Sequence, residues 1–256
     1  KDHLGLLGLL ERKQVAPPAF LLAERWIIDG LGFSEASLRL LPLLAGLVSL
    51  PLVARIAWLV LVTDDDSAPE RPLSHTRSAS PREDQRWTAA LTVGLFAAAY
   101  FPIRYSCEVK PYSLDLATSA MLVWLALEWF RTPTHCRWPL ALILLTPLSL
   151  SLSFTAVLAA GGVAVTLAIW AIRSPSVFRL TMVGGFGLTI AASFLVLRFF
   201  TTQPGQAALN GELTQYWANN FPPQTLGPDL WLWLIRTHTS ELFAYPVGGQ
   251  NGASAL

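Results

Sequence analysis

A nine-residue segment of mixed charge lies between two apolar stretches and contains Arg104, Tyr105, Glu108, Lys110 and Tyr112. An arginine or a lysine can hold a phosphate group as it leaves, and a carboxylate can position an acceptor hydroxyl, take its proton or bind a cation. The same residues also suit a structural role, in which the cations and tyrosines anchor in lipid headgroups and Glu108 pairs with one of the cations. The sequence leaves both interpretations open.

Four further polar residues are candidates for the same chemistry. Asp115 lies about one turn inside the next apolar stretch, where an ionisable residue is costly and so indicates function, unless it is solvated or ion-paired. Arg39 precedes another apolar stretch and can contact a phosphate or simply reach the headgroups. Gln14 can contact substrate or merely be exposed, and Asp2 is a second candidate base beside Glu108.

The composition predicts that these residues belong to a membrane protein. Hydrophobic residues make up 53% of the 256 positions and charged residues 14%, whereas a soluble domain carries about 25% charged residues. The net charge of +1 and the lack of a basic run interleaved with aromatics exclude a nucleic-acid partner. Only two cysteines occur, neither in a metal-binding spacing, so redox or structural-metal chemistry is unsupported.

Long apolar segments predict an all-α, polytopic bundle of about six transmembrane helices, since about 20 apolar residues cross a bilayer. The predicted spans are Leu40–Val62, Thr88–Ile103, Tyr112–Phe130, two within Pro139–Ile172, and Leu180–Leu197. As one helix Pro139–Ile172 would be about 50 Å long, beyond any plausible tilt, so we expect it to turn within the serine-rich stretch Leu150–Phe154.

Arginines in the connectors predict the orientation of these spans. The connectors 63–86, 131–137 and 173–179 carry most of them, and arginine-rich short loops favour the cytoplasm. The chain then divides into an external loop (1–39), a transmembrane bundle (40–198) with a cytoplasmic connector (63–86), and an external, aromatic-rich loop (199–256). The segment 104–111 faces the same external side.

The first external loop predicts a helix lying in the membrane interface. Pro17-Pro18 can start a helix that ends near Gly30 and Gly32, and the predicted helix Pro18–Asp29 is too short to span. Its apolar face is expected to lie opposite Glu24, Arg25 and Asp29. Ser34 is predicted to cap a second helix that runs into the first span.

Two sequence runs carry a family resemblance: QVAPPAFLLAERWIIDGLGFSEASLRLLPLLAG, which begins at Gln14, and YSCEVKPYSLDL, which begins at Tyr105. Together they resemble the GT-C superfamily of integral membrane glycosyltransferases, in its protein mannosyltransferase and aminoarabinose-transferase-like branch. The resemblance covers most of the chain. The order of the motifs is more specific than any single motif. An interfacial-helix loop with a Pro-containing turn comes first, followed by an arginine entering the next span and then by a short acidic, basic and tyrosine motif.

The resemblance implies an enzyme that moves a sugar from a polyprenyl-phosphate donor to a lipid, glycan or protein acceptor on the non-cytoplasmic face of the plasma (inner) membrane. It implies catalytic roles for Glu108 and Asp2. The implied substrate contacts are Arg104, Lys110, Tyr112, Gln14, Arg39 and Asp115. A divalent cation is a possible cofactor with no assigned ligands, and the loop 199–256 is expected to help cover the donor cavity.

One part of the family pattern departs from this sequence. Similar enzymes carry an acidic residue or pair just after a first span, upstream of the Pro turn, but Asp2 lies closer to Pro17 than that pattern requires. We therefore expect the chain to be a fragment and its principal base to precede Lys1. The alternative classes are a transporter or flippase, which predicts paired helix breaks and ionisable groups deep in the membrane, and a non-catalytic assembly subunit.

Overall fold

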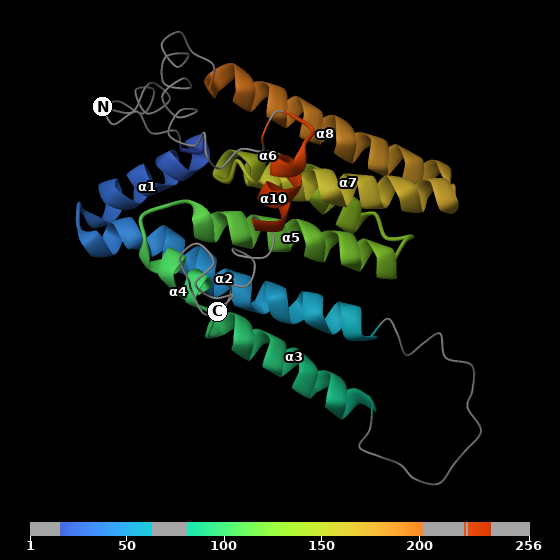
Figure 1. Cartoon of the computed structure of the whole chain (residues 1–256), viewed down its shortest axis with the longest axis horizontal. Coiled ribbons are helices and arrows are strands. Elements are labelled where there is room, and N and C mark those ends of the chain that lie inside the picture. Colours follow the sequence, from blue (N-terminus) through green and yellow to red (C-terminus); the bar gives the residue numbers. More distant parts are fainter. Residues whose placement is uncertain (1–15, 63–80, 202–222, 224, 237–256) are drawn as a thin grey trace.

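The computed structural model describes residues 16–62, 81–201, 223 and 225–236 (Figure 1). These residues form helices joined by short connections, which confirms the predicted all-α fold. The helices are α1 (Pro18–Leu31), α2 (Glu35–Val62), α3 (Pro81–Ala97), α4 (Tyr100–Cys107), α5 (Tyr112–Arg131), α6 (Arg137–Leu152), α7 (Ala156–Arg173), α8 (Val177–Thr201) and α10 (Pro228–Arg236).

Four of these helices, α2, α5, α7 and α8, are long and apolar enough to cross a membrane, and α6 is a shorter apolar helix. The predicted turn between two apolar helices is confirmed, because α6 ends at Leu152 and α7 begins at Ala156. Ser153 Oγ accepts the Ala156 N–H at 3.0 Å and so satisfies one of the free donors at the start of α7. The predicted cap of α2 is also present, since the Ser37 N–H donates to Ser34 Oγ at 3.1 Å.

The prediction that Thr88–Ile103 is one continuous span was wrong. Helix α3 ends at Ala97 and the eight-residue α4 begins at Tyr100, with Ala99 between them in an extended conformation (φ −71°, ψ 137°). The cause is Pro102, which has no N–H for the carbonyl of Ala98 and whose ring would clash with that carbonyl in a continuous helix. Arg104 therefore lies on a separate short helix.

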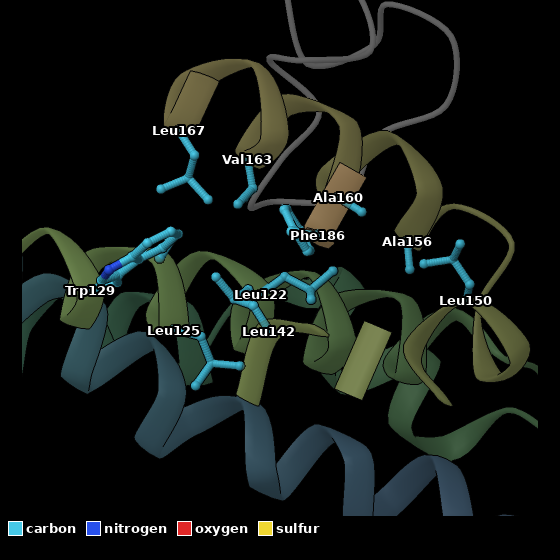
Figure 2. Close-up of a cluster of buried hydrophobic side chains, with 11 residues drawn as sticks. Leu122, Leu125, Trp129, Leu142, Leu150, Ala156, Ala160, Val163, Leu167 and Phe186 are labelled. Atoms are coloured by element: carbon cyan, nitrogen blue, oxygen red, sulfur yellow. The ribbon is translucent and has the colours of Figure 1, made fainter. Parts of the chain in front are cut away.

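Helix α5 lies at the centre of the bundle and packs against α2, α6 and α7. Its buried side chains meet those of α6, α7 and α8 in the main apolar core (Figure 2). This core includes Leu122, Leu125, Trp129, Leu142, Leu150, Ala156, Ala160, Val163, Leu167 and Phe186. A smaller cluster of Phe20, Ala45 and Leu114, with Leu152 against it, holds α1 to the bundle.

The bundle has two ends with different contents (Figure 1). At one end, here called the α1 end, lie α1, α4, the start of α5 and the turn between α6 and α7. At the other, here called the arginine end, lie the ends of α2, α5 and α7 and the starts of α3, α6 and α8. The helix ends that flank the three arginine-bearing connectors thus share one end, as the predicted orientation requires, and the segment 104–111 shares the other end with α1.

Candidate functional site

The connection from α4 to α5 places two cations on either side of one carboxylate. Arg104 Nε donates to Glu108 Oε1 at 2.7 Å, one helical turn along α4, and Lys110 Nζ lies 3.1 Å from Glu108 Oε2. Glu108 ends the helix in an extended conformation, and the Lys110 N–H returns to the Glu108 carbonyl at 2.8 Å. This tight turn brings both cations to the same carboxylate, as the spacing of the three residues allowed.

The two cations change the acidity of Glu108. Hydrogen bonds from Arg104, and then from Lys110, lower the pKa of the Glu108 carboxyl, and the pKa of Arg104 is raised by Glu108 and Tyr100 in return. A carboxylate held ionised in this way is a weak proton acceptor. Glu108 is therefore better placed to fix Arg104 and Lys110 than to take a proton.

Tyrosines surround this ion-paired group. Arg104 Nη1 donates to the Tyr100 hydroxyl at 3.3 Å, and the Arg104 guanidinium lies 5.8 Å from the centre of that ring. Lys110 Nζ lies 5.6 Å from the centre of the Tyr112 ring, which packs against Tyr105 at 4.7 Å between centroids. The structure thus brings together four of the predicted site residues, Arg104, Glu108, Lys110 and Tyr112, in one exposed cluster, here called the α4–α5 cluster.

The position of α4 depends on a glycine of α2. A Cβ added at Gly46 would collide with Ser106 Oγ, so α4 can lie this close to α2 only because residue 46 has no side chain. Ser106 Oγ itself donates to the carbonyl of Pro102 at 2.6 Å. Sequence reasoning missed Gly46, and a glycine in the middle of an apolar helix is a signal for a close approach of another helix.

Asp115 lies in the first turn of α5 and is half-buried. Its carboxylate interacts with the side-chain hydroxyls of Ser153 and Thr155, in the turn between α6 and α7. Asp115 has hydroxyl groups rather than a cation as its partners among the described residues, and it stays partly exposed. These partners come from the serine-rich stretch in which the sequence predicted only a turn.

Glu24 departs from the expectation that it lies on the polar face of α1. Its residue is 6% exposed, and neither carboxylate oxygen has a hydrogen-bond partner among the described residues. Burial raises the pKa of Glu24 to about 7. The physical reason is helical spacing, since Glu24 follows the buried Phe20 by four residues and so shares the face that packs against the bundle. The spacing from Phe20 was the available signal.

The remaining members of the predicted polar face behave as expected. Arg25 Nε and Asp29 form an exposed ion pair at 2.9 Å, one turn apart on α1. Arg39 is also exposed and pairs with Glu35 in the first turn of α2. It lies outside the α4–α5 cluster. Gln14, Asp2 and most of the segment 199–256 lie outside the described residues.

Among the residues that the structure describes, no group of three or more His, Cys, Asp or Glu side chains is arranged to hold a metal ion. No family model, curated protein or solved structure matches this chain. The proposal of a function therefore rests on the sequence motifs and on the geometry of the α4–α5 cluster.

Proposed function

We propose that this chain is part of a membrane glycosyltransferase, which moves a sugar from a polyprenyl-phosphate donor to a lipid, glycan or protein acceptor at the non-cytoplasmic face of the plasma (inner) membrane. The observation that carries the proposal is the α4–α5 cluster, in which Arg104 and Lys110 flank Glu108 at the end of the bundle opposite the arginine-rich connectors. Phosphate binding at a membrane surface needs fixed cations of this kind.

The proposed reaction is a single displacement at the anomeric carbon of the sugar. A carboxylate takes the proton of the acceptor hydroxyl or amine, the acceptor atom bonds to the anomeric carbon, and the bond from that carbon to the phosphate oxygen breaks. The polyprenyl phosphate leaves with the bonding electrons and gains a negative charge, which Arg104 and Lys110 are placed to stabilise. One displacement inverts the configuration at that carbon.

Glu108 acts in this scheme by holding the two cations in place, because its pKa is lowered by them. The proton then goes to another carboxylate, for which the candidates in this chain are Asp115, at the α1 end, and Asp2, which lies outside the described residues. Tyr112, which packs against Lys110, lies where it can contact the sugar or the lipid phosphate.

A transporter would be expected to carry its ionisable groups near the middle of the membrane. The ion pair between spanning helices, Arg55 with Glu128, instead lies in the last turn of α5, at the arginine end. This position supports a role in joining α2 to α5 rather than a role in a substrate pathway.

The test uses the full-length protein in proteoliposomes, with polyprenyl-phosphate sugars as donors and the release of polyprenyl phosphate as the readout. Removing one charged contact to a departing oxyanion typically lowers turnover by about 100-fold to 1,000-fold, and we expect Lys110→Ala and Arg104→Ala to fall in that range. Glu108→Gln, which loosens both cations, should also abolish transfer while membrane insertion is retained.

Asp29→Asn is the matched control, because it removes the carboxylate of an exposed Arg–carboxylate pair with the same spacing of four residues. It should leave release unchanged. Unaltered release in both Lys110→Ala and Glu108→Gln, with both proteins folded, would exclude the α4–α5 cluster from the active site.

A further inference from the structure

A groove runs between α5 and α7 on the outside of the bundle. Its volume is about 340 Å³, and its lining includes Val123, Leu127 and Phe130 of α5 and Ala159, Gly162 and Thr166 of α7. The hydroxyl of Thr166 donates to the carbonyl of Gly162 at 2.9 Å. The lining is therefore apolar, and the Thr166 hydroxyl already has a hydrogen-bond partner within α7.

The groove ends at a cluster of aromatic side chains. Phe130, the last lining residue on α5, packs edge-on against Trp170 of α7, with 4.9 Å between ring centroids. Trp170 also packs against the buried Trp129 at 5.5 Å. Tryptophan is the residue most typical of the boundary between hydrocarbon and headgroups, so the groove reaches from the apolar zone to that boundary.

Three arginines lie on the helix termini at the arginine end, and one of them, Arg179, contacts Trp170. The Arg179 guanidinium lies 4.5 Å from the centre of the Trp170 ring and donates to the carbonyl and hydroxyl of Ser174, both at 2.6 Å. Arg131 follows Phe130 directly, and Arg173 is three residues beyond Trp170; both are exposed. None of the three arginines forms an ion pair with a carboxylate of the described chain, so their positive charge is uncompensated there.

We propose that this groove and the three arginines form a binding site for an anionic phospholipid of the cytoplasmic leaflet. One hydrocarbon chain lies along the groove between α5 and α7, and the phosphate headgroup sits beside Arg131, Arg173 and Arg179. The charge fits this occupant, because the arginine end is predicted to face the cytoplasm and the cytoplasmic leaflet carries the anionic lipids.

The size of the groove favours a lipid chain over another helix. Along α5 the lining runs from Val123 to Phe130, which is about 10 Å of helix. A helix about 10 Å across is too wide to enter a groove of this volume and could only rest on its rim. A single hydrocarbon chain is narrower, and its attraction to the groove comes from van der Waals packing against the lining, since lipid tails already lie outside water.

The test is native mass spectrometry of the purified full-length protein in detergent, titrated with phosphatidylglycerol and separately with phosphatidylcholine. Gly162→Leu adds a side chain to a residue that lines the groove, at a position where a Cβ has nothing within 4 Å. Gly184→Leu on α8 is its control, since its Cβ also meets open space but Gly184 does not line the groove.

For the headgroup the variant is Arg131→Gln with Arg173→Gln, and the control is Arg86→Gln, an exposed arginine of α3 at the same end. We expect the wild type to bind phosphatidylglycerol at least tenfold more tightly than phosphatidylcholine. The double arginine variant should lose about 25-fold in phosphatidylglycerol affinity, since each cation near an anionic headgroup contributes about fivefold. Gly162→Leu should weaken both lipids, and both controls should match the wild type.

Equal binding of the two lipids by the wild type would overturn the proposal, as would unchanged lipid binding in Gly162→Leu. A dimer that is present in the wild type and lost in Gly162→Leu would show that a second copy of the chain occupies the groove, and this result would also overturn it.

Discussion

At the arginine end of the bundle the carboxylate of Glu128 accepts hydrogen bonds from Arg55 Nε at 2.7 Å and from Trp124 Nε1 at 3.1 Å, whereas at the α1 end the carboxylate of Glu24 is buried without a described partner. Both residues are 6% exposed. A buried carboxylate that accepts two hydrogen bonds can join the helices that carry its donors. A buried carboxyl group without donors lowers the free energy of unfolding, because its desolvation is not compensated. The buried carboxylate at the arginine end thus joins α2 to α5, whereas the one at the α1 end joins nothing among the described residues.

The aromatic residues follow the same division. Trp129, which is fully buried, Trp170 and Phe130 pack edge-on at the arginine end. At the α1 end the tyrosines of the α4–α5 cluster lie beside exposed cations instead. Large buried rings stabilise a fold through the area they bury, while exposed tyrosines beside cations remain free to contact a ligand.

The largest loss of stability is expected for Glu128→Ala, at the arginine end. It leaves the half-exposed Arg55 without its carboxylate between α2 and α5, and we expect a loss of about 3 kcal/mol in the free energy of unfolding, the low end for a broken buried pair. Chemical unfolding in mixed micelles measures it. The double variant Arg55→Gln/Glu128→Gln should recover part of the loss, and a double variant less stable than Glu128→Ala would contradict this account.

The opposite result is expected for Glu24→Gln at the α1 end. Because burial raises the folded-state pKa of Glu24 to about 7 from 4.5, the contribution of Glu24 to stability should be most favourable below pH 4.5 and be lost as the pH rises from 4.5 to about 7. The glutamine variant carries no such charge, so it should match the wild type at pH 4 and exceed its stability at pH 8, by up to about 3 kcal/mol. Thermal unfolding at both pH values measures the difference.

Glu128→Gln provides the control for that pH series, since it removes a partnered carboxylate. It should lower stability at pH 8, where Glu24→Gln raises it. Two variants that shift stability in the same direction at pH 8 would show that the two ends do not differ as described.

A smaller effect on folding, but one directed at the proposed active site, is expected for Gly46→Ala. The added methyl group would push Ser106, and with it α4, away from α2, at a cost of about 1–3 kcal/mol for overpacking. Sugar transfer should fall by more than the loss of folded protein explains, because Arg104 and Glu108 move with α4. Gly94→Ala on α3 meets open space and should leave both properties unharmed.

The smallest effect on stability is expected from Glu108→Gln, because exposed ion pairs contribute little to folding. The lowered pKa of Glu108 means that its stabilising contribution is present above the unfolded value of 4.5 and is lost as the pH falls through the lower folded-state value. At pH 7 the melting temperature should therefore stay close to that of the wild type while transfer is lost. A large drop in melting temperature would show that the α4–α5 cluster is mainly structural.

Much of the fold follows from the sequence, because the signals involved are local. The turn between α6 and α7 was predicted from the length of an uncharged stretch and its serines, and α1 from Pro17-Pro18 and the following glycines. The helix break before α4 was missed, although Pro102 was visible, because proline is often tolerated within transmembrane helices. Indeed α2 continues through Pro42 and Pro51.

The candidate site divides in the same way. The charges of Arg104, Glu108 and Lys110 lie within seven residues of the sequence. Opposite charges this close in sequence can pair in most turn geometries, so their pairing could be predicted. The residues that position the site are distant in sequence. Gly46 allows α4 to pack close to α2, and the hydroxyls of Ser153 and Thr155 interact with Asp115. Contacts of that separation leave no periodic pattern in a single sequence.

The sequence by itself determined that this is an apolar, all-helical chain, that α6 turns into α7 at the serines, and which short segment concentrates cations, a carboxylate and tyrosines. Only the tertiary structure decided which carboxylates are paired and which are buried alone, since the partner of Glu128 lies 73 residues away and the burial of Glu24 depends on how α1 packs against α2 and α6. Periodicity and composition are properties of neighbouring residues, whereas the energy of a buried charge depends on every element that surrounds it.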